Sequence, residues 1–271
     1  MMDKDIERRF VFAADLAREA GRCASRYFRD RSLAVTMKGQ NDPVTTADLE
    51  ADQLIAKRIA EQFPEDRILS EESGGDPANR LWIVDPIDGT QNFARGIARY
   101  AVSIAFYWNG TVMLGAIYDP MADELFTARR GGGAFLNGSP IRASEISEPK
   151  SALVEAGYSL KRPLADYHAL VGRLLEAGYN VRQVGSAALG LAEVACGRID
   201  GYCELHLASW DVAAGLVLVE EAGGRTSDFF TGNGLTDGNF LIAAAPALQM
   251  HLHEVAERER YPAELPCPIR S

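Results

Sequence analysis

Residues 82–90 read Trp82-Ile83-Val84-Asp85-Pro86-Ile87-Asp88-Gly89-Thr90, an apolar run followed by two closely spaced carboxylates. The apolar run predicts a short buried strand that carries Asp85 to its C-terminal end. Pro86 cannot donate a backbone hydrogen bond, so we expect the strand to end there. Gly89 permits a tight turn. The turn is expected to bring Asp88 back beside Asp85.

This arrangement predicts a site for a divalent cation beside an anion. Asp85 and Asp88 repel each other at short range unless a cation lies between them. Thr90 is expected to open a helix, and the free N–H groups at a helix N-terminus bind anions. Carboxylates for a hard cation next to an anion site are typical of metal-assisted phosphoryl transfer. The alternative is a plain turn with a helix cap, as expected for Asp119-Pro120, which has no acidic partner at the matching position and no Gly-Thr after it.

Three other segments carry side chains that could reach the same cation. Ser70-Glu71-Glu72-Ser73 precedes the strand, and Ser209-Trp210-Asp211-Val212 opens an apolar helix. Pro43-Val44-Thr45-Thr46-Ala47-Asp48 offers a Thr/Asp pair that could orient a water molecule. Taken singly, each has a simpler interpretation, either a solvated acidic loop or an ordinary helix start. Only their combination favours a catalytic site.

The periodicity of apolar residues predicts the elements on either side of this stretch. The expected helices cover residues 5–29, 46–63, 165–177, 187–196 and 211–222, with a last one that ends near residue 259. The expected strands cover residues 81–85, 102–108, 111–118, 124–128, 152–156, 181–184, 202–205 and 240–244. Asn109-Gly110 predicts a tight hairpin between the second and third strands.

These elements predict a layered α/β (α+β) fold. Helices beside an antiparallel sheet come first, and an alternating helix and strand pattern follows. We expect an N-terminal lobe over residues 1–145 and a C-terminal lobe over residues 146–271, packed as one compact unit with a cleft between them.

Composition narrows the function classes. The 271 residues are 47% hydrophobic and 24% charged, as in soluble globular proteins. The net charge of −10 argues against a nucleic-acid partner. No apolar run reaches the ~18 residues of a membrane helix, and no secretory signal is recognised. The four scattered cysteines are typical of thiols in a reducing compartment, so we expect a cytoplasmic protein with no membrane partner.

Considered together, the acidic segments resemble one known family, the inositol monophosphatases. The resemblance rests on Glu71-Glu72-Ser73, on residues 82–90 and on Trp210-Asp211-Val212-Ala213-Ala214-Gly215, which occur in the family's order. Residues 42–48 and 131–138 are weaker matches, and Gln91-Asn92-Phe93 is similar to the branch that acts on inositol phosphates. The resemblance implies an inositol-monophosphatase-like sandwich of alternating helix and sheet layers.

The resemblance also implies roles for individual residues. Glu71, Asp85, Asp88, Asp211 and the backbone carbonyl of Ile87 would hold two or three Mg²⁺ ions. Thr90 and Asp48 would position and deprotonate the attacking water, with Glu71 as a further catalytic residue. The amides of Gly89 and Thr90 would bind the phosphate. The substrate hydroxyls would meet Asp88, Gly185, Ser186, Ala187 and Glu204.

The implied activity is Mg²⁺-dependent hydrolysis of an inositol monophosphate or a similar small polyol phosphate. Inhibition by lithium and a homodimer are also implied. Two alternatives stay open: the same chemistry on nucleotide 3′-phosphates, sugar bisphosphates or histidinol phosphate, and an interaction or regulatory protein with a secondary phosphatase activity. The chain departs from the family pattern at residues 95–100 and at Ala208, both near the expected substrate entrance.

Overall fold

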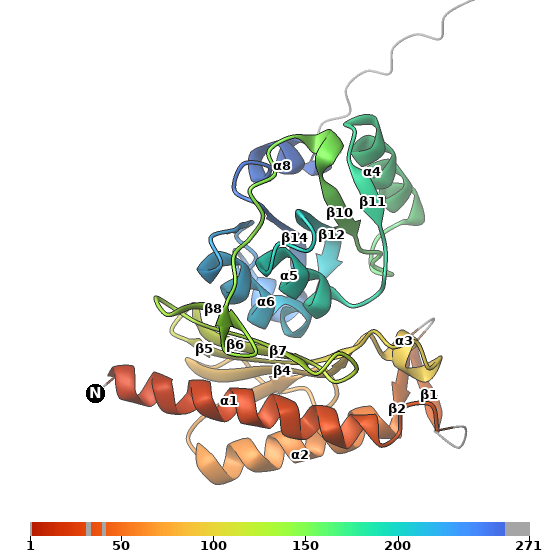
Figure 1. Ribbon diagram of the computed structural model, residues 1–271. Helices are drawn as coiled ribbons and strands as arrows, with labels where there is room; N and C mark the ends of the chain where they lie inside the picture. Colours follow the sequence, from red (N-terminus) through yellow and green to blue (C-terminus); the bar gives the residue numbers. More distant parts are fainter. Residues whose placement is uncertain (1, 31–33, 40–41, 258–271) are drawn as a thin grey trace, which may run out of the picture.

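The computed structural model describes residues 2–30, 34–39 and 42–257, which form alternating layers of helix and sheet (Figure 1). Helices α1 (Met2–Ser25) and α2 (Thr46–Gln62) form one outer layer. Helices α4 (Leu164–Glu176) and α8 (Gln249–Glu257) form the opposite one. The layered α/β fold expected from the sequence is therefore confirmed.

A seven-stranded sheet covers one face of α1 and α2. Its strand order is β3-β4-β5-β6-β7-β8-β9, with β3 parallel to β4 and all other pairs antiparallel. The strands are β3 (Arg67–Ser70), β4 (Arg80–Asp88), β5 (Ala101–Trp108), β6 (Thr111–Asp119), β7 (Glu124–Arg129), β8 (Gly133–Leu136) and β9 (Ser139–Pro140). A separate hairpin of β1 (Val35–Gly39) and β2 (Asp42–Thr45) lies beside α3 (Thr90–Ala94).

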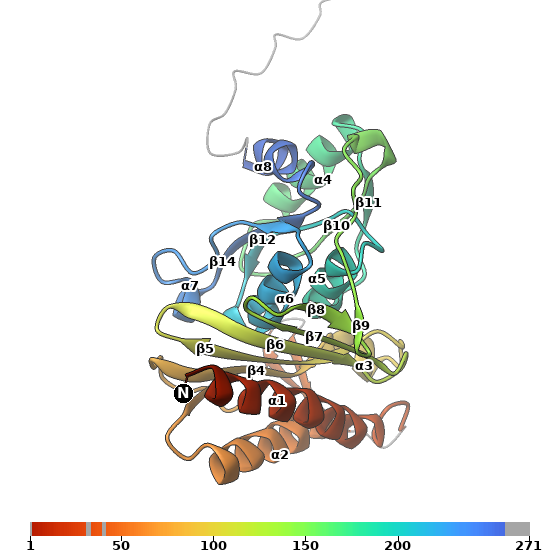
Figure 2. The same cartoon turned by 60° about the vertical axis from the view of Figure 1, so that its left-hand side comes forward.

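Helices α5 (Ala187–Ala195) and α6 (Ser209–Glu221) lie between the two sheets (Figure 2). Each of these helices meets a sheet on both sides. Helix α6 is therefore apolar on nearly all sides instead of carrying one apolar stripe. The second sheet has the order β11-β10-β12-β14-β13. Its strands are β10 (Leu153–Ala156), β11 (Asn180–Arg182), β12 (Gly201–Leu207), β13 (Arg225–Thr226) and β14 (Asn239–Ala244), and the short helix α7 covers Gly234–Asp237.

Most predicted elements are present with shifted ends. The hairpin at Asn109-Gly110 is confirmed, and both residues have the positive φ that such a turn requires, 46° and 90°. The predicted helix over 5–29 ends at Ser25, and residues 258–259 of the predicted last helix lie outside the described residues. No helix in the described ranges is both long and apolar enough to cross a membrane. The division into lobes at residue 145 stays a prediction.

One expectation near the site was wrong: Pro86 does not end its strand. Strand β4 continues to Asp88, which pairs with Ala101 of β5 after a register shift that follows Asp85. The register shift is a bulge, and a bulge tolerates proline because its residues do not all pair with the neighbouring strand. The two aspartates are therefore brought together by a bulged strand instead of a turn after its end.

Candidate metal centre and active site

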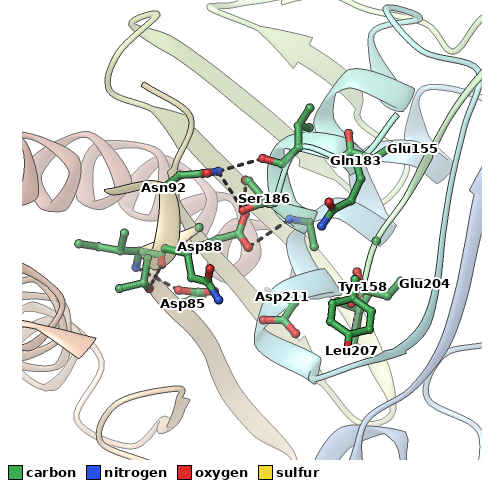
Figure 3. Close-up of a pocket in the computed structure, with 18 of the residues that line it drawn as sticks. Asp85, Asp88, Asn92, Glu155, Tyr158, Gln183, Ser186, Glu204, Leu207 and Asp211 are labelled. Atoms are coloured by element: carbon green, nitrogen blue, oxygen red, sulfur yellow. Dashed lines mark hydrogen bonds between the residues drawn. The ribbon is translucent and has the colours of Figure 1, made fainter. Parts of the chain in front are cut away.

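Three aspartates from distant parts of the chain meet at the bulge of β4. Asp85, Asp88 and Asp211 each offer a carboxylate oxygen, and these atoms lie within 4.8 Å of one another. Asp85 and Asp88 come from β4, and Asp211 comes from the first turn of α6 (Figure 3). Three carboxylates at this spacing form a donor set for a hard divalent cation.

Backbone amides hold each of these carboxylates in place. Asp85 accepts a hydrogen bond from the amide of Ile87 at 3.0 Å, which fixes it across the bulge. Asp211 accepts from the amide of Ala208 at 2.7 Å and so caps α6. Each aspartate therefore has an orientation that does not depend on a cation.

Asp88 caps a helix of the other half of the chain. Its carboxylate accepts from the hydroxyl of Ser186 and from the amides of Ala187 at 3.2 Å and Ala188 at 3.0 Å, at the start of α5. The helix dipole favours a negative charge at this position. Asp88 thereby links the seven-stranded sheet to the middle helix layer, and the Ser186 hydroxyl is already engaged.

Burial and mutual repulsion disfavour the charged forms of these acids. The pKa of Asp85 is raised well above its usual value, first by burial and then by the charges of Glu71, Asp88 and Asp211. Burial and the charge of Glu71 likewise raise the pKa of Asp211. A divalent cation removes this repulsion, so the donor set fits Mg²⁺ chemically.

Thr90 lies directly beside this cluster. Its hydroxyl oxygen is 3.1 Å from Asp48 Oδ1 and 2.9 Å from the carbonyl oxygen of Ile87. The other oxygen of Asp48 accepts from the amide and the hydroxyl of Thr45, a capping box that starts α2. Burial raises the pKa of Asp48 to about 6, and the hydrogen bonds from Thr45 oppose that rise. A buried carboxyl group thus contacts a hydroxyl next to the candidate metal site.

Gly89 connects the aspartates to α3 with a backbone that favours glycine. Its φ is +95°, and a Cβ atom there would lie 3.0 Å from the carbonyl oxygen of Arg99 and 3.1 Å from that of Gly185. Asn92 also holds α3 close to these carbonyl groups. Its side-chain amide donates to the carbonyls of Arg99, Val184 and Gly185 at 2.9–3.1 Å. Helix α3 is therefore tied to the loop that precedes α5.

A cavity of about 670 Å³ opens next to the carboxylate cluster. All but one of the residues expected at the site line it, including Glu71, which also faces the cluster. The exception is Asp48, which contacts the cavity residue Thr90. The lining residues among those predicted are Glu71, Asp85, Ile87, Asp88, Gly89, Thr90, Gly185, Ser186, Ala187, Glu204 and Asp211.

The sequence did not predict three of the residues on the far wall of this cavity. Glu155, Tyr158 and Tyr202 line it together with the predicted Glu204. The one signal for Glu155 was an acidic residue in the otherwise apolar strand 152–156. Tyr158 and Tyr202 carried no signal, because a tyrosine in or after a strand more often belongs to the core.

The model of the inositol monophosphatase family matches residues 5–261 of the sequence, nearly its whole length. The chain belongs to the inositol monophosphatase family. The match agrees with the structure, in which Glu71, Asp85, Asp88 and Asp211, from three separate segments of the sequence, line one cavity. The family expected from these segments is thereby confirmed.

Some similar proteins within the family are named SuhB, and others are named IMPase. The Nus factor SuhB of Escherichia coli strain K12 is 41% identical over 241 residues, which cover 86% of this chain and 90% of that protein. The extragenic suppressor protein suhB of Bartonella henselae superposes with a TM-score of 0.85 at 33% identity, covering 95% of this chain and 99% of that one. The IMPase of Thermotoga maritima superposes with a TM-score of 0.83 at 32% identity, covering 93% and 97%.

Proposed function

We propose that this chain is a Mg²⁺-dependent phosphomonoesterase that hydrolyses an inositol monophosphate or a similar small polyol phosphate. The observation that carries the proposal is the convergence of Asp85, Asp88 and Asp211 within 4.8 Å, beside the Thr90–Asp48 pair. Family membership supports the same reaction class. The substrate, and the assignment of each residue to a role, belong to the proposal.

In this proposal, Asp85, Asp88, Asp211, Glu71 and the carbonyl of Ile87 hold two or three Mg²⁺ ions. Bound there, the ions supply positive charge that stabilises the transferring phosphoryl group and acidifies water. The chain's own contribution is to fix the carboxylates before a cation arrives, through the amides described above. That preorganisation lets positioning and charge neutralisation provide most of the acceleration.

Thr90 and Asp48 orient and deprotonate the attacking water. The Thr90 hydroxyl lies within 3.1 Å of a buried carboxyl group, so it can accept a hydrogen bond from water while it donates to Asp48. The amides of Gly89 and Thr90 receive the phosphate. Burial raises the pKa of Asp48 to about 6 in the metal-free protein, so this carboxyl group is a suitable acceptor for the proton of the attacking water.

The opposite wall of the cavity binds the leaving alcohol. Glu204 lies there and is 7% exposed, and carboxylates pair well with vicinal hydroxyls. The lining carries several carboxylates, with Arg95 as its only lysine or arginine among the described residues. A neutral polyol therefore suits this wall better than an alcohol with a second phosphate group.

A phosphate-release screen tests the substrate class. With Mg²⁺ present, we expect myo-inositol monophosphates to give a higher kcat/KM than adenosine 3′-phosphates, fructose bisphosphate or histidinol phosphate. LiCl titrated against KCl tests the lithium sensitivity that the family implies. A higher kcat/KM for any of the other esters would assign the chain to another branch of the family.

A second function is favoured by the names of its relatives. The Nus factor SuhB proteins are named for a role other than phosphate-ester hydrolysis, and one shares 41% identity with this chain. We propose on this basis that the chain also works as an interaction protein, beside its phosphatase activity. The exclusion of a nucleic-acid partner rested on net charge alone and is not retained. The homodimer and the cytoplasmic location stay predictions.

Affinity capture from a lysate separates the two functions. Wild-type protein and Asp85→Asn protein are used as baits, because the substitution removes a proposed metal ligand on the inner wall of the cavity. Partners retained by both baits, and absent with an unrelated bait of similar charge, support a role that does not need catalysis. If no protein or nucleic acid is retained specifically, the interaction role is rejected and the phosphatase proposal stands alone.

A further inference from the structure

Glu204 is held by a tyrosine from its own strand. Strand β12 places Tyr202 and Glu204 on one face, because side chains two residues apart in a strand point the same way. The hydroxyl of Tyr202 donates to Glu204 Oε2 at 2.6 Å, and both residues are buried, 2% and 7% exposed. A short hydrogen bond between two buried groups fixes the carboxylate strongly.

Two glycines make room for this pair. A Cβ atom at Gly190 of α5 would lie 2.6 Å from the ring of Tyr202, so the ring fits only because the side chain is missing there. A Cβ atom at Gly157, just after β10, would lie 1.8 Å from Glu204 Oε2 and 2.7 Å from the hydroxyl oxygen of Tyr202. The amide of Gly157 donates to the carbonyl of Cys203 at 2.9 Å, which keeps its backbone against β12.

The pair faces the proposed substrate. Gly157, Tyr202 and Glu204 all line the cavity that contains Asp85 and Asp211. Tyr202 engages Oε2 of Glu204, whereas none of the described residues makes a hydrogen bond to the second oxygen, Oε1. Burial raises the pKa of Glu204 to about 8, and the hydrogen bond from Tyr202 opposes that rise. Tyr202 thus both orients the carboxylate and favours its charged, hydrogen-bond-accepting form.

We infer that Tyr202 is a positioning residue for substrate choice: with Gly157 behind it, it aims Glu204 at a hydroxyl of the leaving alcohol. This inference rests on the proposed phosphatase function and deepens it. It predicts a selective defect, because a simple ester without neighbouring hydroxyls has no group for Glu204 to recognise. A merely structural role for Tyr202 would affect all esters alike.

The test compares two esters in the Mg²⁺-loaded enzyme: myo-inositol 1-phosphate and p-nitrophenyl phosphate. We expect Tyr202→Phe to lower kcat/KM for the inositol ester about tenfold, as for the loss of one hydrogen bond, and to change the nitrophenyl ester less than about twofold. In a Glu204→Gln background the same change should have little further effect, since the two residues act as one unit. Gly157→Ala should give the same selective loss by displacing the carboxylate.

Tyr179→Phe is the matched control. Tyr179 is also buried, 3% exposed, and its hydroxyl lies 2.8 Å from His251 Nδ1, but it belongs to the outer layer and does not line the cavity. Loss of the Tyr179 hydroxyl should leave the ratio of the kcat/KM values for the two esters unchanged. Equal losses on both esters in Tyr202→Phe, or additive losses in the double variant, overturn the positioning role. Turnover of neither ester by the wild-type enzyme overturns the proposed function, and the positioning role falls with it.

Discussion

At the residue scale, the site brings three aspartates so close together that their negative charges repel one another. The amide of Ile87 holds Asp85, the amide of Ala208 holds Asp211, and the start of α5 holds Asp88. Burial raises the pKa of all three aspartates. Without a cation, the burial and mutual repulsion of these charges lower the stability of the fold. The cluster is therefore best explained by the ion it would bind.

Asp85→Asn tests this explanation on both activity and stability. We expect turnover of the inositol ester to fall by more than about a hundredfold, because a proposed metal ligand is lost. Without metal, the Tm should rise by about 2–4 °C, the shift that ~1 kcal/mol produces in a chain of this size. Asp119→Asn is the control, since Asp119 also lies in a strand and precedes a proline but does not line the cavity. Near-normal turnover in Asp85→Asn contradicts the ligand assignment.

Thr90 allows a second test at this scale. Thr90→Ala removes the hydroxyl that contacts Asp48 and should lower kcat by about a hundredfold or more, the usual contribution of a positioned proton acceptor. Thr90→Ser keeps the hydroxyl and should retain most of the activity. Both variants are measured at saturating Mg²⁺ and substrate. Equal kcat values for the alanine and serine variants argue against a role for the hydroxyl.

At the element scale, a buried ion pair fixes α1 to the large sheet. Asp66 accepts from Arg9 at 2.8 and 3.1 Å, from Arg80 at 2.9 Å and from the indole of Trp82 at 3.1 Å. The guanidinium of Arg9 also lies 4.3 Å from the ring centroid of Phe63. Helix α1 thus docks through a charged contact surrounded by aromatic rings, in addition to its apolar face.

Removing one partner of this ion pair should destabilise the fold. Asp66→Ala leaves the buried Arg9 with only the partly exposed Asp5 as a carboxylate partner. It also removes the acceptor of Arg80 and Trp82, and we expect the free energy of unfolding to fall by about 3–5 kcal/mol. Glu19→Ala breaks the exposed pair between α1 and Arg58 of α2 and should cost less than about 1 kcal/mol. Urea denaturation of both variants checks this. Similar losses in the two variants contradict the special role of the Asp66 contact.

The sequence predicted elements better than it predicted their pairing. Amphipathic periodicity indicated α1 and α2, and Asn109-Gly110 indicated the hairpin, because these signals are local. The bulge after Asp85 depends on the partner strand β5, which no local pattern reveals. The contact of the Tyr202–Glu204 pair with Gly157 likewise depends on how β10 and β12 lie in the sheet. Short strands such as β9, with two residues, carry too little pattern to predict.

At the scale of the whole molecule, the cavity lies where the two halves of the chain meet. Asp88 caps α5, and Asn92 donates to Val184 and Gly185, so the β4–α3 segment is bound to the C-terminal half at two points. Family resemblance predicted the acidic segments and Glu204, but Glu155, Tyr158 and Tyr202 on the far wall of the cavity became apparent only from the assembled layers. A cation held by Asp88 and Asp211 would tie the halves together at a third point.

This arrangement predicts how stability depends on pH and Mg²⁺. Because the pKa values of Asp85, Asp88 and Asp211 are raised in the folded protein, the native state binds more protons than the unfolded state above about pH 4. The metal-free protein should therefore lose stability as pH rises from 4 through these raised pKa values. Mg²⁺ should raise the Tm more at pH 8 than at pH 5.5. Thermal melts with and without Mg²⁺ check this, and an equal Mg²⁺ effect at both pH values contradicts it.

The proposed phosphatase reaction depends on a reversible Mg²⁺ site built from these carboxylates, and one titration tests for that site. Phosphate release from myo-inositol 1-phosphate is measured while Mg²⁺ is added to metal-stripped wild-type and Asp211→Asn protein, with far-ultraviolet circular dichroism to show that both stay folded. We predict no turnover in excess EDTA, saturable activation of the wild type by Mg²⁺, and no comparable activation of Asp211→Asn. Full turnover of the wild type in excess EDTA would contradict the account.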